Sequence, residues 1–206
     1  MNWLKNYKRN FIVLVATMFC TFQLCAQNIL EAEELGQMKT FVNLQEALSQ
    51  PDSVFKLNLK GKKLKEFPDE IFSLHNLQVL NLSKNHIKEI PADIEKLKSL
   101  QELDLSNNDL TQLPPQIGGL IHLSKLKLNK NEITSLPREI GGLIHLEVLE
   151  MWNNELDTIP DEVRDLVRLK VFELRGILFS DEKQKYIRSL LPETKIYFSP
   201  SCACKQ

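Results

Sequence analysis

A period of 23 residues runs through the middle of this chain and limits its fold more than any other feature of the sequence. Five prolines mark the period, each preceded by an apolar residue and followed three positions later by isoleucine or valine. They are Pro68, Pro91, Pro114, Pro137 and Pro160. A unit of this length cannot bury its apolar side alone, so the units must stack into one continuous core.

Each unit has two halves with different structural signals. The first follows the pattern L-x-x-L-x-L-x-x-N-x-L, as in residues 100–110, and its alternation places leucines on one face of a short strand. The second follows L-P-x-x-I-x-x-L and is predicted to form 3-10 or single-turn helical pieces. Proline fixes φ there, the stretch allows only about two helical turns, and glycine pairs such as 118–119 weaken a regular helix.

An asparagine stands in the turn after each of four predicted strands. A short amide can satisfy backbone groups that a turn leaves without partners, so we interpret these asparagines as structural. The first unit has Lys62 at this position and Gly61 before it, which makes it an atypical, cap-like repeat. The four residues of this ladder are Asn85, Asn108, Asn131 and Asn154.

The repeat pattern resembles that of leucine-rich-repeat proteins. The 23-residue form with its Leu-Pro corner is similar to bacterial repeats and to Ras-associated leucine-rich-repeat proteins, and it covers residues 54–176 as five repeats and a partial sixth. The resemblance implies an α/β solenoid, a right-handed arc with a short-stranded parallel sheet on its concave face, 3-10 or short helical segments on its convex face and helical caps at both ends. It determines the fold far better than the function.

Residues 27–53 are predicted to form the N-terminal helical cap. Asn43 and Glu46 have the spacing of a capping box at the start of a short helix. Phe41, Leu44 and Leu48 then form an apolar stripe that ends before the proline at position 51. Such a cap would keep the first repeat from exposing its leucines to water.

Residues 177–206 are predicted to form the C-terminal cap and tail. Ser180 begins a helix with acidic residues in its first turn, and residues 196–198 add a final strand. The side chains expected to cover the last repeat are Tyr186, Ile187, Leu190 and Leu191.

The first 26 residues have the features of a secretory signal peptide. A basic start is followed by the apolar run 11–20 and by Ala26 just before Gln27. An uncleaved anchor is the alternative, but the run is shorter than the roughly 20 residues of a spanning helix. We therefore expect cleavage near Ala26-Gln27 and a secreted or periplasmic, envelope-associated protein. Cleavage removes three cations and no acid, which changes 26 basic and 27 acidic side chains to 23 and 27, a net charge of −4.

Lipid attachment at Cys20 or Cys25 is the only route by which we expect the mature protein to reach a membrane. That processing needs a small residue just before the cysteine, whereas Phe19 and Leu24 stand there, so it is the less favoured alternative. The remaining pair, Cys202-Ala-Cys204, makes at most half of a metal site and fits better with an oxidised or intermolecular pair.

No pattern in the sequence indicates catalysis. We find no His-x-x-x-His pair, no glycine-rich phosphate loop and no Gly-x-Ser-x-Gly, and His122 and His145 share one repeat position, which indicates a structural origin. Basic and acidic residues are balanced, so no basic field is expected to hold a phosphate backbone. The expectation is a chain with no enzymatic activity, cofactor, metal, small-molecule substrate or nucleic-acid partner.

The outward strand positions are predicted to line the concave face in three columns. Trp152 interrupts a polar column, and we expect Val148, Val171 and Arg175 around it, a composition typical of residues that dominate interface energies. The alternatives are that aromatics are common here in bacterial repeats, or that the C-terminal segment covers Trp152. The predicted partner-binding residues are Trp152, Arg175, Val148, Val171, Glu150, Lys127, Asn129 and Asp104.

A mixed-charge face of this kind suits a protein epitope better than a polyanion. The sequence therefore predicts a non-catalytic, extracytoplasmic protein-binding module. The alternative is a structural envelope or adhesion component that works through self-association.

Overall fold

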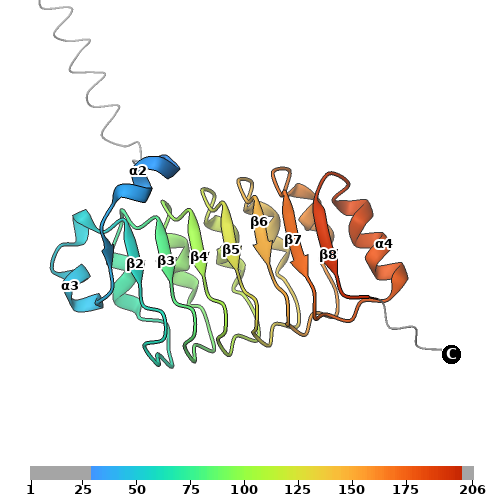
Figure 1. The fold of residues 1–206 in the computed structure, drawn as a ribbon, viewed down its shortest axis with the longest axis horizontal. Helices are drawn as coiled ribbons and strands as arrows, with labels where there is room; N and C mark the ends of the chain where they lie inside the picture. The colour runs from blue at the N-terminus through green and yellow to red at the C-terminus, as the bar shows by residue number, and fades with distance from the viewer. Residues whose placement is uncertain (1–28, 201–206) are drawn as a thin grey trace, which may run out of the picture.

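The computed structural model describes residues 29–200, which form a solenoid with a parallel sheet on one face and short helical turns on the other (Figure 1). Within this range one sheet of eight strands runs in sequence order. Its strands are β1 (Thr40–Phe41), β2 (Lys56–Asn58), β3 (Val79–Asn81), β4 (Glu102–Asp104), β5 (Lys125–Lys127), β6 (Val148–Glu150), β7 (Val171–Leu174) and β8 (Lys195–Phe198).

The helical turns lie behind the sheet, on the convex side (Figure 1). In the repeats they are 3-10 helices, as the proline corners and short spacing predict, and each begins next to its proline. They are η2 (Asp69–Ser73), η3 (Ala92–Lys96), η4 (Pro115–Gly119), η5 (Arg138–Gly142) and η6 (Asp161–Asp165). The fold predicted from the repeat is confirmed.

The register of the sheet stacks identical repeat positions on one another. Leu57, Leu80, Leu103, Leu126 and Leu149 are Cα partners across β2 to β6, and each is almost wholly buried. Phe172 continues this column in β7 and pairs with Ile196 of β8. One apolar core therefore runs from the first strand to the last, as expected when no unit can close a core alone.

The turn after each strand adopts a left-handed conformation at a fixed repeat position. The residue there has a φ between 55° and 79° in every repeat. Glycine occupies this position in the first and last repeats, and lysine or asparagine in the others. The residues are Gly61, Lys84, Asn107, Lys130, Asn153 and Gly176.

The asparagine ladder lies directly after these left-handed residues and is buried. Asn131 is representative: its Nδ2 donates to the carbonyl oxygens of Leu105 (3.1 Å) and Leu128 (2.8 Å), and its Oδ1 accepts from the amide of Leu110 (3.1 Å). Asn85, Asn108 and Asn154 form the corresponding bonds in their repeats. Each side chain thus connects its own turn to the preceding repeat.

The glycine pairs allow adjacent convex turns to approach closely. A Cβ atom on Gly118 would lie 2.0 Å from the carbonyl oxygen of Glu139, and one on Gly142 would lie 2.6 Å from that of Gly118. From the sequence, these glycines were attributed to the weakening of a regular helix, which is therefore only part of the reason that glycine occurs here. The backbones of η4 and η5 leave no room for a side chain at these positions.

The N-terminal cap is more elaborate than predicted. Asn43 caps α3 (Leu44–Leu48) by accepting from the amide of Glu46 at 3.2 Å, whereas Phe41 lies in β1 rather than on a helical stripe. The correction arises because β1 pairs with β2 and extends the sheet by one strand. A further helix, α2 (Ala32–Gln37), which the sequence did not indicate to us, precedes β1, and the turn η1 (Pro51–Ser53) follows α3.

The C-terminal cap consists of α4 (Asp181–Leu190) and β8. Ser180 caps α4 by accepting from the amide of Lys183, and Ile187 and Leu191 are buried. Tyr186 does not cover the last repeat as expected: it is 47% exposed, and its hydroxyl donates to Asp161, a bond that raises its pKa.

The predicted signal sequence (1–26), Cys20, Cys25 and the Cys202-Ala-Cys204 tail lie outside the described residues. Among residues 29–200, no helix is long and apolar enough to cross a membrane.

Candidate functional site

The exposed face of the sheet carries the outward side chains in the three columns that the alternation predicts. The first column is fixed by Cα pairing from β2 to β7: Lys56, Val79, Glu102, Lys125, Val148 and Val171. The second is Asn58, Asn81, Asp104, Lys127, Glu150 and Glu173. Backbone bonds between neighbouring turns align the third: Lys60, Ser83, Ser106, Asn129, Trp152 and Arg175.

Charges in the middle of this face are paired with one another. The ammonium of Lys125 lies 3.2 Å from the carboxylate of Glu102, and that of Lys127 lies 3.6 Å from Glu150. Asp104 accepts from both the amide (3.0 Å) and the hydroxyl (2.6 Å) of Ser106, which ties its carboxylate to the adjacent turn. A partner bound here would have to compete with these contacts, each worth little at a surface.

The C-terminal end of the face holds cations against aromatic rings. Lys130 places its ammonium 5.0 Å from the ring centre of Trp152, which is half-buried. Trp152, Asn153 and Arg175 line an open hollow of about 360 Å³. An apolar surface beside positive charge is suited to binding a side chain of a partner.

Arg175 is held in place by its own chain. Its Nε and one terminal nitrogen donate to the two carboxylate oxygens of Glu173, both at 2.7 Å, and this bond raises the pKa of the guanidinium. Glu173 is only 7% exposed, so the pair combines a buried acid with an exposed base. The guanidinium carbon also lies 5.6 Å from the ring centre of Tyr197.

Val148 and Val171 do not surround Trp152 as the sequence suggested. The two valines pair with each other at the start of β6 and β7. Trp152 follows the end of β6, and Glu150 lies between Val148 and Trp152 on the same face. Trp152 is the fourth residue after Val148, which corresponds to about 13 Å along an extended chain. Asn129, in the Trp152 column, is 8% exposed and offers little surface.

Tyr197 and Lys195 belong to this face and were missed from the sequence. Tyr197 pairs with Glu173 and extends the second column, and Lys195 pairs with Val171 and extends the first. The Lys195 ammonium lies 5.3 Å from the Tyr197 ring, and its bond to the phenol raises the lysine pKa. Alternation within residues 195–198, once read as a strand, would have placed Tyr197 outward.

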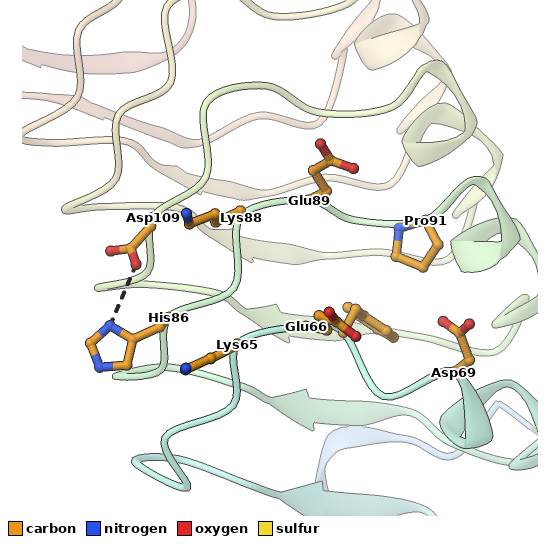
Figure 2. A pocket seen from close by; sticks show the side chains of 9 residues that line it. Lys65, Glu66, Asp69, His86, Lys88, Glu89, Pro91 and Asp109 are labelled. Carbon is orange, nitrogen blue, oxygen red and sulfur yellow. Dashed lines mark ion pairs between the residues drawn. The ribbon is translucent and has the colours of Figure 1, made fainter.

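A larger hollow, of about 710 Å³, lies along the loops that follow β2, β3 and β4 (Figure 2). Lys65, Lys88 and His86 line its outer side, where His86 Nδ1 approaches the carboxylate of Asp109 at 3.4 Å. Glu66, Glu89 and Asp69 line the other side. The hollow is open and its groups form no nucleophile–base arrangement. In the part of the chain that the structure describes, no three His, Cys, Asp or Glu side chains are grouped to hold a metal ion.

Comparisons with known proteins agree on the repeat. Residues 54–191 match the family model described as "Leucine-rich repeat region". No curated protein sequence matches the chain significantly.

Among solved structures, a leucine-rich-repeat protein of Leptospira interrogans is 37% identical with a TM-score of 0.67, and the match covers 74% of this chain and 39% of that one. The plant peptide hormone receptor RGFR1, solved in complex with RGF2, is 29% identical with a TM-score of 0.55, over 68% of this chain and 23% of the receptor. An internalin of Listeria monocytogenes is 16% identical with a TM-score of 0.56, over 78% and 54%, a likeness of fold alone. The matches span less than two thirds of each of these proteins.

Proposed function

The chain belongs to the leucine-rich-repeat family, and we propose that it is a non-catalytic module that binds a protein partner on its concave sheet face, outside the cytoplasm. Leucine-rich repeats generally mediate protein–protein interaction and are typically not catalytic. Among the neighbours, RGFR1 was solved with RGF2, which supports a peptide or protein as the kind of ligand. Such a partner needs an extended surface rather than a deep cavity.

The observation that carries the proposal is the C-terminal end of the face, formed by Trp152, Arg175 and Tyr197. Interface energy concentrates in aromatic and arginine side chains, and here the arginine is already oriented by Glu173. Because Arg175 is already oriented, its side chain loses less conformational entropy when a partner binds. The paired charges of Lys127 and Glu150 border this end and would contribute to specificity more than to affinity.

The extracytoplasmic location rests on the sequence of residues 1–26, with its basic start, apolar run and Ala26. To test it, the full chain with a C-terminal tag would be expressed in a bacterial host, and the N-terminus of the exported product would be determined by mass spectrometry. We expect export and a mature chain that begins at Gln27. A tagged protein retained in the cytoplasm with residues 1–26 intact would contradict this location.

The binding face is tested by affinity capture from envelope and host-surface extracts with this exported product. We compare the unchanged protein with Trp152→Ala and with a control, Val79→Ala, which shortens an apolar side chain at the other end of the same face. Loss of one captured protein with Trp152→Ala but not with the control is the expected result. Capture unaffected by Trp152→Ala would place the binding surface elsewhere.

If no partner is captured, the mass of the protein would be followed against its concentration by analytical ultracentrifugation. A mass that rises with concentration would favour the alternative, a structural component that works through self-association. A constant monomer mass would leave neither reading supported.

A further inference from the structure

A cluster of positive charge lies on the loops that follow β2 and β3, next to the N-terminal end of the face described above. These loops lie at the lower edge of the sheet in Figure 1, where all the parallel strands end. Six exposed lysines project from them, although the whole chain carries a net charge of −1. We call these residues the basic edge: Lys60, Lys62, Lys63, Lys65, Lys84 and Lys88.

The lysines of the basic edge differ from other surface cations in their ion pairing. Within residues 29–200, none of the six is among the side chains that form ion pairs, whereas other surface cations such as Lys96, Lys125 and Lys170 are paired. Neighbouring loops are separated by about 5 Å, the spacing of hydrogen-bonded strands, so the ammonium groups repel one another. A partner with closely spaced negative charges would relieve that repulsion.

Glu66 and Glu89, which follow Lys65 and Lys88 in the chain, line the adjacent hollow, whereas the acids at the strand-exit position of the later repeats lie farther along the edge. The repeat position of Lys63 and His86 is taken by Asp109, Glu132 and Glu155 in the next three repeats. Lys63 and Glu155 are therefore four repeats, about 20 Å, apart, more than twice the screening length of about 8 Å in physiological salt. Of these three later acids, Asp109 is the nearest to the basic edge, and it pairs with His86 at 3.4 Å.

We propose that the basic edge docks the protein onto an anionic lipid surface, in an edge-on orientation. The lysines project from loop tips, whereas the adjacent hollow in Figure 2 also contains Glu66, Glu89 and Asp69, which would repel a polyanion lying along it. A broad charged surface contacts the tips and avoids these acids. Each lysine near such a surface increases the affinity of the protein for it through attraction to the anionic headgroups.

The composition of the edge specifies a peripheral contact with the lipid headgroups. Phe67, the aromatic residue beside the lysines, is 7% exposed and stacks on Phe72 at 5.4 Å, so it is unavailable to sugars, bases or acyl chains. Large exposed apolar side chains among the described residues, such as Ile144 and Leu178, lie on other loops. Binding should therefore be reversed by salt. This route to a membrane needs no lipid attachment, unlike the one expected from the sequence.

The test measures binding of the full-length chain to vesicles by co-sedimentation. Vesicles of equal phosphatidylglycerol and phosphatidylcholine are compared with pure phosphatidylcholine, which also reports any binding through the apolar segment 11–20. The edge variant is Lys62→Gln with Lys65→Gln and Lys88→Gln. The control removes the same charge elsewhere: Lys98→Gln, Arg168→Gln and Lys185→Gln, all exposed.

We expect binding to the phosphatidylglycerol vesicles only, reversal at about 0.5 M salt, and an affinity about 100-fold lower for the edge variant. The control variant should bind nearly as well as the unchanged chain. An equal loss of vesicle affinity in both variants would show that binding depends on net charge rather than on the basic edge, and would overturn the proposal. It would also fail if the unchanged chain ignored these vesicles but bound heparin or DNA, because the partner would then be a linear polyanion.

Discussion

Alanine at Gly118 and at Gly119 should have opposite effects on stability, although the two glycines are adjacent in η4. A Cβ atom on Gly118 would lie 2.0 Å from the carbonyl oxygen and 2.8 Å from the carbonyl carbon of Glu139. Both obstacles are backbone atoms of η5, so they cannot move aside as a flexible side chain would. On Gly119 the nearest atoms would be the Glu95 Cβ at 3.4 Å and the Lys98 Nζ at 3.5 Å, which is ordinary contact.

The expected change in the free energy of unfolding follows from these distances. Gly118→Ala must displace η5 by about 1 Å or more, and overpacking of this kind costs about 1–3 kcal/mol. Gly119→Ala meets no obstacle and restricts the unfolded chain, which stabilises a protein by about 0.4–1 kcal/mol. The two variants should therefore differ by about 1.5–4 kcal/mol in the free energy of unfolding.

Equilibrium unfolding in urea, followed by circular dichroism, would measure this difference, with the slope of each transition used to check that the variants unfold in the same way. In thermal unfolding the same difference corresponds to a separation of about 3–16 °C in Tm. Equal stability of the two variants would refute the argument that close approach of adjacent turns requires the first glycine.

Three further predictions concern the ladder and the binding face. Asn131→Asp should lower the free energy of unfolding by about 2–4 kcal/mol, because two buried carbonyls lose their donor; an unchanged urea midpoint would contradict this. Glu173→Gln should lower it by about 1–2 kcal/mol and release Arg175, visible as loss of the paired conformation in a crystal structure. Trp152→Ala should cost only about 1 kcal/mol in thermal unfolding, whereas a loss of 3 kcal/mol or more would identify the ring as part of the core.

The interior of this protein could be read from its sequence because one period governs it. Each leucine position recurs at the same offset, so a single assignment of strand and face determines all the repeats, and the observed register from β2 to β7 agrees. The outward columns follow from the same alternation. The placement of Val148 and Val171 beside Trp152 was wrong because it considered only which face the side chains share, whereas four residues of extended chain already separate Val148 from Trp152 by about 13 Å.

The ends could be predicted less well because they lie outside the repeat. The final strand was predicted at residues 196–198, but without a leucine signature its side chains were not assigned to a face; α2 and β1 have neither a proline corner nor a ladder asparagine. Their positions depend on pairing with the neighbouring repeat, which a local pattern does not encode. The same holds for Gly118, whose obstacle belongs to the next turn, 21 residues later.

These differences between interior and exterior indicate where recognition should concentrate. In the middle of the sheet, Lys125 with Glu102 and Lys127 with Glu150 already satisfy one another, so a partner gains little by replacing those contacts. At the C-terminal end, Trp152 keeps apolar surface partly exposed, and burial of apolar surface is the larger source of binding free energy. A partner that contacts both regions should therefore owe its orientation to the charged middle and its affinity to the aromatic end.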